Sequence, residues 1–500
     1  MNNIFAMGVD SNITWLWCIF ILLLSVAYWY LSRPKNLPPG TAGLPIVGYL
    51  PFIGKLPQET LAKLGKRYGN LFHLYLGSRL VIVLNDYSAI QDAFVRNAHI
   101  FSGRPLDSIL KETSIKNLGV ISNDGAYWKE HRRFILSNLK NYGFGKMSFE
   151  PLILDEIHQF LKELKKNAGK TFDIRHLLMN STGNNVNMVT GKRFDYDDPA
   201  ILQFNDAVRQ GEIDLPLFSL ATFFPWLSKL PGTDKILNRK QIRNYVESTL
   251  NAASKILHTV INEYEDGLKG NYIHAYLTER NSRLKVKENE DIFTEIGIKY
   301  IARDLLIAGT DTTASTLLFS LLYMTLNPEI QQKVQNEIDS VIGRERQPSY
   351  NDRFNMPYTE ATILEIHRKV SLAPLSLPHR NVKEVMICGY VIPKHTTIIP
   401  NLWAVHHDPK IWGDPDTFRP ERFIGPDGKL TKTEYVIPFS VGKRACVGEP
   451  LARMELFLYF VSLLQQFTFI PPDGKMPTLD FHPGLASRPK CRNVCAISRC

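Results

Sequence analysis

The chain has 500 residues, of which 44% are hydrophobic, and it carries a formal net charge of +10 at pH 7. This length exceeds that of a usual single domain and predicts a large core or several lobes, while the ordinary hydrophobic fraction excludes a protein built mainly of membrane spans. Six scattered cysteines without a C-x-x-C pair argue against a disulfide scaffold and favour a reducing, cytosol-facing location. The positive charge predicts an acidic partner or an anionic surface. Because no compact basic run contains interleaved aromatic residues, we expect no nucleic-acid partner.

The first predicted element is an uncharged apolar run over residues 13–31. It is long enough to cross a bilayer as one helix, and tryptophans and tyrosines lie toward its ends. Asp10 precedes the run, whereas Arg33 and Lys35 follow it, so the positive-inside rule keeps the rest of the chain in the cytosol. A cleaved signal peptide is the alternative, but the run is long for one and its leading segment has no basic residue.

A proline-rich linker follows this run, because paired prolines prevent the helix from continuing. We therefore predict a membrane anchor over residues 1–36 and a catalytic domain over residues 37–500. Residues 71–84 are typical of two strands around a Gly-Ser turn. Helical periodicity marks residues 127–140, 150–167, 240–266, 291–325, 328–342 and 357–370. Short strand-like runs reappear near residues 385–400 and at the C-terminus, so the pattern predicts a mainly α fold with a small β lobe.

A glycine-framed loop over residues 439–448 places Cys446 behind Phe439 and Arg444, just ahead of an apolar helical run. A thiolate held in this way can bind one face of a metal and leave the opposite face free. Phe439 would shield an iron–sulfur bond from water, and Arg444 would pair with a haem propionate, since guanidinium suits planar carboxylates. A buried structural cysteine is the alternative for Cys446 alone, but the complete F-x-x-G-x-R-x-C-x-G spacing argues against it.

This loop resembles the haem-binding signature of the cytochromes P-450, in which a cysteine thiolate donates electron density to the iron and favours O–O cleavage. The resemblance continues from about Pro38 to the C-terminus, through further motifs in the family's order. It implies the P-450 fold and haem b (iron protoporphyrin IX), with Cys446 as the axial ligand of the iron. The chain looks most like the animal microsomal members that metabolise drugs, insecticides, steroids and juvenoids. This likeness implies the endoplasmic reticulum membrane, electrons from NADPH–cytochrome P-450 reductase and possible help from cytochrome b5.

The segment over residues 295–325 carries a second motif, A-G-T-D-T-T, which includes Gly309, Asp311 and Thr312. Gly309 weakens a helix locally, and the Thr312 hydroxyl can bond the carbonyl four residues earlier, so this helix could open a groove for O₂. Asp311 and Thr312 form an acid–alcohol pair suited to proton delivery. The resemblance assigns Thr312 to stabilising the oxygen intermediate and Asp311 to feeding protons. A salt bridge for Asp311 and a packed core hydroxyl for Thr312 are the alternatives.

Several cations match positions that bind haem propionates in the family. They are Arg104, Arg132 with the neutral indole N–H donor Trp128, and His379, and each of them alone would be an ordinary surface or core residue. A basic face on the cysteine side of the haem would steer an acidic reductase, although a solvated charged helix is the alternative. Its members would be Lys129, Arg132, Arg133, Lys140, Lys443 and Arg453.

A structural network is expected on the cysteine side. Glu365 and Arg368 form the family's E-x-x-R pair on one helix face, and Arg422 belongs to its second arginine motif. Alone, such a pair is usually a solvated ion pair of little value. Together, the three residues would make a buried network that holds the Cys446 loop.

Family topology also implies the walls of a substrate pocket. The candidates lie within residues 106–121 and 204–228 and at Ile301, Leu305, Ala308, Ala373, Leu377 and Leu485. Such a mainly apolar site suits sterols, fatty acids, terpenoids and xenobiotics alike. The aromatic residues within 218–226 are expected to dip into the membrane and admit lipophilic substrates.

We predict a membrane-anchored monooxygenase that inserts one oxygen atom from O₂ into a lipophilic substrate by hydroxylation or epoxidation. One alternative is a haem-thiolate isomerase or dehydratase that rearranges peroxides, but Asp311 and Thr312 argue against it because such relatives often lack this pair. A non-enzymatic haem sensor is the other alternative, and a proton relay would have no use there. The tail cysteines Cys491, Cys495 and Cys500 lack a second ligand pair, so zinc is disfavoured.

Overall fold

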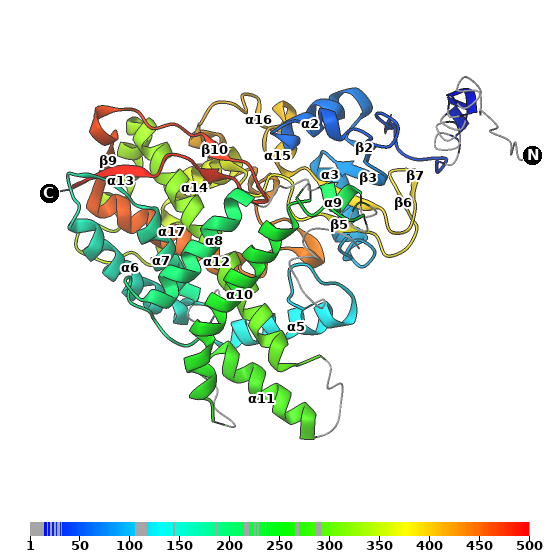
Figure 1. The fold of residues 1–500 in the computed structure, drawn as a ribbon. Coiled ribbons are helices and arrows are strands. Elements are labelled where there is room, and N and C mark those ends of the chain that lie inside the picture. The colour runs from blue at the N-terminus through cyan, green and yellow to red at the C-terminus, as the bar shows by residue number, and fades with distance from the viewer. Residues whose placement is uncertain are drawn as a thin grey trace, which may run out of the picture.

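We describe the protein from a computed structural model. The described residues are 33–105, 118–143, 146–186, 189–214, 220–224, 227, 230–235, 237–265, 270–285 and 292–499, with 15–17, 19–20, 23–24, 27 and 31. They form a large helical part and a smaller β lobe, and the blue N-terminal turns lie beside the β lobe (Figure 1). The mainly α fold with a small β lobe is therefore confirmed.

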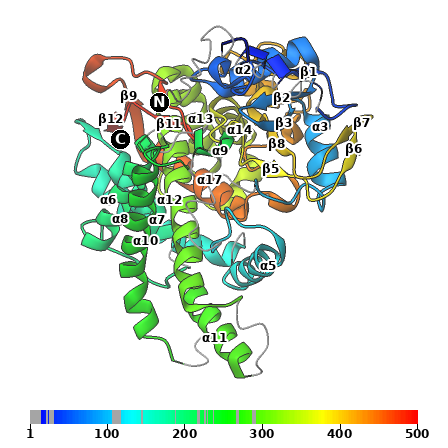
Figure 2. The ribbon, with the colours of Figure 1, turned by 45° about the vertical axis from the view of Figure 1, so that its right-hand side comes forward.

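The helical part is organised around α12 (Glu295–Leu326), a 32-residue helix that passes through its middle (Figure 2). Thr294 begins this helix by accepting a hydrogen bond from the Gly297 N–H at 2.9 Å. The helix is apolar on most of its surface because other helices pack around it. These are α7 (Arg175–Asn185), α10 (Arg239–Asn262), α11 (Tyr272–Lys285), α13 (Pro328–Val341), α14 (Pro357–Val370) and α17 (Glu449–Gln466). Three more helices pack against members of this group, namely α5 (Gly125–Asn141), α6 (Glu150–Lys165) and α8 (Pro199–Asp214).

Within the described residues, α12 is also the one helix long and apolar enough to cross a membrane. Its most apolar window is 78% buried inside the protein, as befits the central helix of a large core.

The β lobe is built on a five-stranded sheet with the order β1-β2-β3-β8-β5. Its strands are β1 (Gly40–Thr41), β2 (Leu71–Leu76), β3 (Arg79–Leu84), β5 (His379–Arg380) and β8 (Thr397–Pro400). β2 and β3 are antiparallel, with Leu74 opposite Val81, whereas β3 and β8 are parallel. Alternate residues of these strands enter two different apolar clusters, so both faces of the sheet are buried.

Smaller elements complete the fold. The strands are β4 (Thr171–Asp173), β6 (Val385–Ile387), β7 (Tyr390–Ile392), β9 (Phe467–Ile470), β10 (Phe481–His482), β11 (Arg488–Pro489) and β12 (Asn493–Ser498). The helices are α2 (Pro57–Tyr68), α3 (Tyr87–Gln91), α9 (Leu220–Phe223), α15 (Leu402–His406) and α16 (Pro409–Trp412). The strands pair in three small sheets with the orders β4-β12-β9, β6-β7 and β10-β11. Among the short helices, α15 packs against α2.

The strand pair predicted over residues 71–84 and the six predicted helices are confirmed to within a few residues at most ends. The helices α2, α7, α8 and α11 and the short helices α3, α9, α15 and α16 were not predicted. α11 shows why, since its buried side chains are confined to its first half and none in its second half is buried. Such a helix forms because neighbouring elements cover its first turns, which periodicity does not reveal.

Candidate active site

The Cys446 loop folds back on itself and packs against η2 (Asp92–Arg96). The Cys446 N–H donates a hydrogen bond to the Phe439 carbonyl oxygen at 2.9 Å. Gly442 has a φ of +81°, and a Cβ there would collide with the carbonyl oxygen of Phe94. Glycine is therefore required at this position both for its backbone conformation and for the close approach to η2.

The Cys446 side chain lies in a recess. It is accessible at the molecular surface, yet the surrounding protein raises the pKa of its thiol by burial. A thiol on an open surface would not be desolvated in this way. A positive charge or a metal ion brought to this recess would favour the thiolate.

Buried arginines lie next to this loop. Arg444 donates from Nε to the Ser102 carbonyl oxygen at 2.8 Å and from Nη2 to the Asn123 carbonyl oxygen at 2.6 Å. Its guanidinium stacks 3.5 Å from the ring centre of Trp128 on α5. Burial, together with the neighbouring charge of Arg104, lowers the pKa of Arg444 to about 8.

Arg132 joins α5 directly to the cysteine loop. Its Nη2 donates to the carbonyl oxygen of Ala445, the residue before Cys446, at 2.7 Å. Arg104 is buried, and its Nε and Nη1 donate to the carbonyl oxygens of Ile121 and Pro378 at 3.1 and 2.9 Å. Burial and the charge of Arg132 lower the pKa of Arg104 to about 10.

His379 lies in the same neighbourhood as a neutral side chain. Its ring stacks on Phe94 with the centroids 3.9 Å apart, and its Nδ1 is 2.8 Å from the Phe101 carbonyl oxygen. Burial, with the charge of Arg104, holds the pKa of His379 well below its usual value. Because a carbonyl only accepts, Nδ1 carries the hydrogen in this arrangement.

The charges of this cluster fit the expected cofactor. Arg104, Arg132 and Arg444 are cations, and the nearby charge of Asp124 only partly offsets the lowered pKa values of Arg104 and Arg444. Asp124 is already engaged, because it accepts from the Arg104 N–H and from Arg380 Nη2 at 2.9 and 2.7 Å. Burial, reinforced by the repulsion between these cations, lowers the pKa values of Arg104 and Arg444, and a buried anionic group would offset both effects. Two propionates beside a thiol in a recess match this donor set, so haem b fits.

α12 carries the predicted acid–alcohol pair. Thr312 Oγ1 donates to the Ala308 carbonyl oxygen at 2.7 Å, the bond to the fourth preceding residue that the sequence predicted. Ala308 is exposed although most of this helix is buried, so the helix turn over residues 308–312 borders accessible space. Gly309 has a further role, since a Cβ there would come within 2.6 Å of Val186 Cγ2 at the end of α7.

Asp311 does not face open space. Its carboxylate is buried between two arginines, with Arg488 Nε 2.8 Å from Oδ2 and Arg175 Nη2 3.4 Å from Oδ1. The sequence offered a surface salt bridge as the alternative for this residue. The structure places a buried ion pair there, which links α12 to β11 and α7.

Glu365, Arg368 and Arg422 meet in the core, with all three side chains at most 2% exposed. Arg368 donates from Nε and Nη2 to the two Glu365 oxygens at 2.7 and 2.8 Å. Arg422, from the short helix η8 (Pro420–Phe423), donates from Nε to Glu365 Oε1 at 3.1 Å. The Arg419 N–H donates to the same oxygen at 2.9 Å, so this carboxylate has four donors.

His406 is a residue that sequence reasoning missed. It lies at the end of α15, and its Nε2 accepts from the Ile437 N–H at 2.9 Å, while Nδ1 lies 2.8 Å from Ser371 Oγ. Ile437 begins the segment that leads to Phe439 and Cys446, so this neutral histidine fixes the start of the loop. Burial holds the pKa of His406 well below its usual value. No motif marks this histidine in the sequence.

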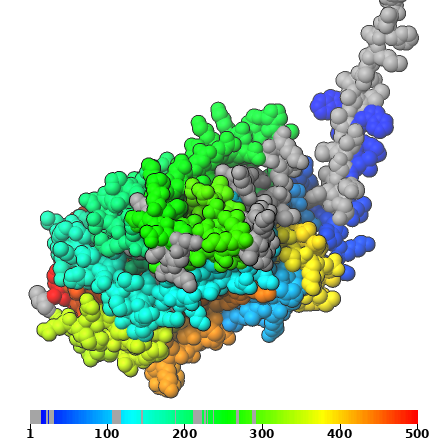
Figure 3. All heavy atoms as spheres, turned by 90° about the horizontal axis from the view of Figure 1, so that it is seen from below, coloured from blue at the N-terminus to red at the C-terminus, as the bar shows by residue number. Residues whose placement is uncertain are grey.

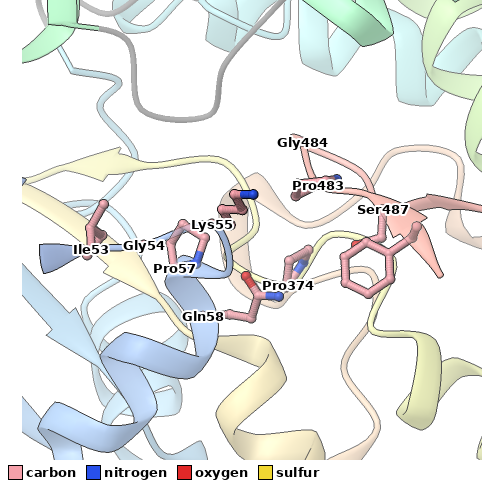
Figure 4. Close-up of a pocket in the computed structure, with 10 residues that line it drawn as sticks. Ile53, Gly54, Lys55, Pro57, Gln58, Pro374, Pro483, Gly484 and Ser487 are labelled. Atoms are coloured by element: carbon pink, nitrogen blue, oxygen red, sulfur yellow. The ribbon is translucent and has the colours of Figure 1, made fainter. Parts of the chain in front are cut away.

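The predicted walls of the substrate pocket divide into two groups. Ile301 has no accessible surface and lies in the main core cluster, so it does not line a space in this structure. Leu305, Ala373, Leu377 and Leu485 are partly accessible and Ala308 is exposed. A pocket of about 270 Å³ adjoins two of these segments, between α2, Pro374 and the β10–β11 hairpin (Figure 4). Its lining includes Pro57, Pro374 and Gly484.

The expectation that Phe223 and Phe224 dip into a membrane is wrong. Both rings are buried, at 4% and 6% exposed, in the apolar cluster of the β lobe. The segment is docked by Arg79 Nε, which donates to the Thr222 carbonyl oxygen at 2.6 Å, and by Ser78 Oγ, which donates to the Phe223 carbonyl oxygen. Aromatic composition alone did not distinguish rings that face lipid from rings that face a sheet.

Other predicted positions lie outside the described residues. They are 106–117 of the first wall, Phe218, Pro225 and Trp226 of the aromatic segment, and Cys500 of the tail. Cys491 is partly exposed, and Cys495 is buried in β12. The described residues contain no group of three or more histidine, cysteine or acidic side chains placed to hold a metal ion.

Comparison with known proteins identifies the family. Residues 38–496 match the family model described as cytochrome P-450. The chain is 39% identical to cytochrome P-450 2U1 of Rattus norvegicus over 515 aligned positions, which cover 96% of this chain and 94% of the relative. It is 38% identical to cytochrome P-450 2J1 of Oryctolagus cuniculus, with 96% of each chain covered. It is 37% identical to cytochrome P-450 2J2 of Homo sapiens, with 95% and 94% covered.

The matched region spans the cysteine loop, the central helix and the arginine cluster described above. The chain therefore belongs to the cytochrome P-450 family, and it is a haem-thiolate monooxygenase that binds haem b and acts with O₂, a redox partner and a lipophilic substrate.

Proposed function

We propose that Cys446 is the axial ligand of the haem iron and that the neighbouring cationic cluster binds the haem propionates. The single observation that carries this proposal is a thiol beside buried arginines, whose pKa values are lowered first by burial and then by their mutual charge. Phe439, whose carbonyl oxygen accepts from the Cys446 N–H, is proposed to shield the sulfur from water. The propionate-binding set is Arg104, Trp128, Arg132, His379 and Arg444.

Haem b, when bound through Cys446, supplies the iron at which O₂ is activated for transfer of one oxygen atom. The chain supplies proton delivery on the opposite side, and we assign this role to Thr312 and Asp311. The Thr312 hydrogen is bonded to the Ala308 carbonyl, which leaves the lone pairs of its oxygen free to accept a hydrogen bond from an incoming group. Asp311, held as a carboxylate by two arginines, accepts and passes on protons that arrive from the β11 side.

We propose a structural role, without proton transfer, for the network of Glu365, Arg368 and Arg422. It would hold the Cys446 loop in position. The partly accessible positions Leu305, Ala308, Ala373, Leu377 and Leu485 are proposed to contact the substrate. Their apolar character suits a lipophilic molecule and would exclude water from the reacting atoms.

We further propose a single-pass anchor over residues 1–36 and a cytosolic catalytic domain over residues 37–500, at the endoplasmic reticulum membrane. The described residues between 15 and 31 are helical, and Trp15, Leu16, Leu23 and Leu31 are all more than half exposed. Large apolar side chains with this much exposed surface are suited to lipid. Arg33 and Lys35 follow on the cytosolic side.

NADPH–cytochrome P-450 reductase is the proposed electron donor, with cytochrome b5 as a second one. The support is a set of exposed cations around the cysteine loop, namely Lys129, Arg133, Lys140 and Lys443. α5, which carries three of them, lies at the surface beside the orange C-terminal segment (Figure 3). A positive face of this kind raises the rate of encounter with an acidic protein.

The test is Thr312→Ala in the reconstituted membrane enzyme, compared with Thr316→Ala as a matched control. Thr316 Oγ1 makes the same type of bond, to the Thr312 carbonyl oxygen at 2.8 Å, one turn further along the helix. Thr312→Ala should retain haem but divert NADPH electrons to hydrogen peroxide, whereas Thr316→Ala should retain coupled turnover. If both variants give the wild-type yield of product per NADPH, the assignment of Thr312 is refuted.

Substrates are sought by incubation with a lipophilic library, scored by the gain of one oxygen atom in mass spectra. Consumption of NADPH in step with product supports the monooxygenase assignment. Rearrangement of an added hydroperoxide without NADPH would instead favour the isomerase or dehydratase alternative.

A further inference from the structure

The pocket beside the start of α2 contains polar groups that the proposed function does not use. It has a volume of about 270 Å³ and lies between the segment that leads into α2, Pro374 and the β10–β11 hairpin (Figure 4). None of the residues that line it belongs to the cysteine loop, to the arginine cluster or to the positions proposed to contact the substrate. Its chemistry therefore has to be derived from its own walls.

Gln58 is the most informative residue of this lining. It is only 4% exposed, and its carbonyl oxygen accepts from Asn401 Nδ2 at 2.9 Å, which fixes the first turn of α2. Within the described residues, neither its side-chain amide nor its backbone N–H has a hydrogen-bond partner. Buried polar groups are nearly always hydrogen-bonded, so an unpaired amide at the wall of a cavity indicates a partner in the cavity.

The first turn of α2 adds a preference for anions. Pro57 has no N–H, and Leu56 before it provides no side-chain cap. The N–H of Gln58 is thus left free at the positive end of a 12-residue helix. Glu59 is the acidic residue of this turn, and it is not part of the pocket lining. Helix ends of this kind bind carboxylate and phosphate groups when further donors complete the site.

Two more polar side chains line the cavity. Ser487 is 3% exposed, and its N–H donates to the Leu372 carbonyl oxygen at 2.7 Å, but its hydroxyl has no partner in the part of the chain that the structure describes. Lys55 is exposed, and it forms no ion pair with a described residue. It is the one charged residue among the described residues of the lining. The cavity therefore offers donors and a cation, and no acidic side chain of its lining opposes an anion.

The rest of the lining is mainly apolar and is held in place. It includes Ile53, Pro374 and Phe481. The Trp403 N–H donates to the Pro374 carbonyl oxygen at 3.0 Å, and Phe481 pairs with Pro489 across the hairpin. The volume equals that of roughly nine water molecules at about 30 Å³ each, so a ligand of roughly ten non-hydrogen atoms would fill the cavity.

We propose that this pocket is a binding site for a small organic acid with one carboxylate and an apolar body. Gln58, Ser487 and Lys55 donate hydrogen bonds to the carboxylate, and the apolar body lies against Pro374 and Phe481. A single cation balances a single negative charge, so a monocarboxylate suits the site better than a doubly charged phosphate. This site goes beyond the monooxygenase function and does not depend on it.

The first test is isothermal titration of the haem-loaded, full-length enzyme with benzoate, which is of the required size. Benzamide has the same shape without the charge, and inorganic phosphate has charge without an apolar body. Benzoate should bind at least about fivefold more tightly than either, because a charge-assisted hydrogen bond is stronger than a neutral one. Equal affinity for benzamide would overturn the anion site, and equal affinity for phosphate would overturn the assignment to an organic acid.

Variants locate the bound ligand. Lys55→Met removes the cation from an exposed position, and Gln58→Met removes the amide but keeps the backbone carbonyl that Asn401 binds. Each should weaken benzoate binding at least about fivefold. Lys63→Met is the matched control, because Lys63 is an exposed cation of α2 outside the lining, and it should bind benzoate like wild type. If Lys55→Met binds benzoate with wild-type affinity, the proposal is overturned.

The haem absorption spectrum separates this site from the reaction centre. Benzoate bound beside α2 should leave the spectrum unchanged at the concentration that saturates the titration, whereas a molecule that reaches the iron alters it. A spectral change that is equally large in wild type and in Lys55→Met would place the ligand at the haem and refute the proposal. Because titration needs no turnover, this result stays valid even if the roles assigned to Thr312 and Asp311 fail.

Discussion

Two regions of the molecule each contain a buried glutamate, and the two side chains differ in their hydrogen-bond partners. Glu365 lies on α14 in the network proposed to hold the cysteine loop, and Glu455 lies on α17 against α12. Glu365 receives hydrogen bonds from Arg368, Arg422 and the Arg419 backbone, so both of its oxygens are satisfied. Glu455 receives one long hydrogen bond from Thr313, and its second oxygen is bare. Both residues are at most 2% exposed. Burial alone therefore does not decide whether an acid is charged.

The difference indicates what each region is for. A carboxylate filled with arginine donors is fixed in place, and removal of any partner leaves a buried charge behind. A lone acid among hydroxyls can gain or lose a proton without disrupting an ion pair. The region around Glu365 accordingly keeps a fixed shape, whereas Glu455 is a buried acid that no cation holds among the described residues.

The largest expected effect comes from Cys446→Ser on the cysteine side. A serine oxygen is a poor ligand for this iron, so monooxygenase activity should fall to background. Product formation and the spectrum of the reduced enzyme under carbon monoxide measure the change. A variant that retains wild-type turnover would contradict the assignment of the axial ligand.

The next largest effect is expected from Glu365→Ala, which strands two arginine cations in the core. Such losses cost roughly 3–5 kcal/mol of folding free energy. Chemical denaturation and haem content of the purified protein should both report the loss. Glu455→Gln is the control variant, because it leaves no buried charge without a partner, and it should lose much less folding free energy. Equal losses in the two variants would contradict the proposed difference between the two glutamates.

A smaller effect is expected from His406→Phe, which deprives the Ile437 N–H of its acceptor. An unpaired buried donor costs about 1–3 kcal/mol of the free energy of unfolding at pH 7. Since burial holds the folded-state pKa of His406 below its usual value, the unfolded chain takes up a proton there first as the pH falls. His406 therefore stabilises the folded protein fully at pH values above its unfolded-state pKa of about 6.5, and this stabilisation declines as the pH falls below that value.

Wild type should therefore lose more stability between pH 7 and pH 5 than His406→Phe does, as measured by denaturation at both pH values. Identical losses in the two proteins would show that His406 is not one of the groups responsible.

The smallest effect is expected from Gly309→Ala in the central region. The new Cβ would come within 2.6 Å of the Val186 side chain, and overpacking costs about 1–3 kcal/mol. Because alanine has a higher helix propensity than glycine, the same substitution also stabilises the helix by about 1 kcal/mol. The net decrease in the free energy of unfolding should therefore be near 1 kcal/mol. In the double variant with Val186→Ala the two changes should compensate, and simple additivity in denaturation experiments would refute the packing explanation.

Motif spacing predicted the parts of the site that depend on local geometry. Glu365 and Arg368 lie three residues apart on one helix, and Thr312 bonds a carbonyl four residues back, so sequence spacing determines both contacts. The β2–β3 pair and the long helices follow from periodicity for the same reason. The family resemblance supplied the rest of the site list.

Contacts between distant segments were not predictable. The partners of Asp311 come from α7 and β11, and the acceptor for the Ile437 N–H comes from α15. The burial of Phe223 and Phe224 also depends on where the sheet lies, which no local pattern encodes. The burial of Glu455 could not be predicted either, because a single acidic residue in an apolar helix usually indicates an exposed position.

The docking of α9 on the sheet has a consequence for how firmly this segment is held. Any movement of α9 away from the β2–β3 turn breaks the bonds from Arg79 and Ser78 and uncovers Phe223 and Phe224. In water, exposing each ring costs about 1.5–3 kcal/mol, so a wide opening is rare there. The two rings together therefore resist any loosening of α9 by about 3–6 kcal/mol.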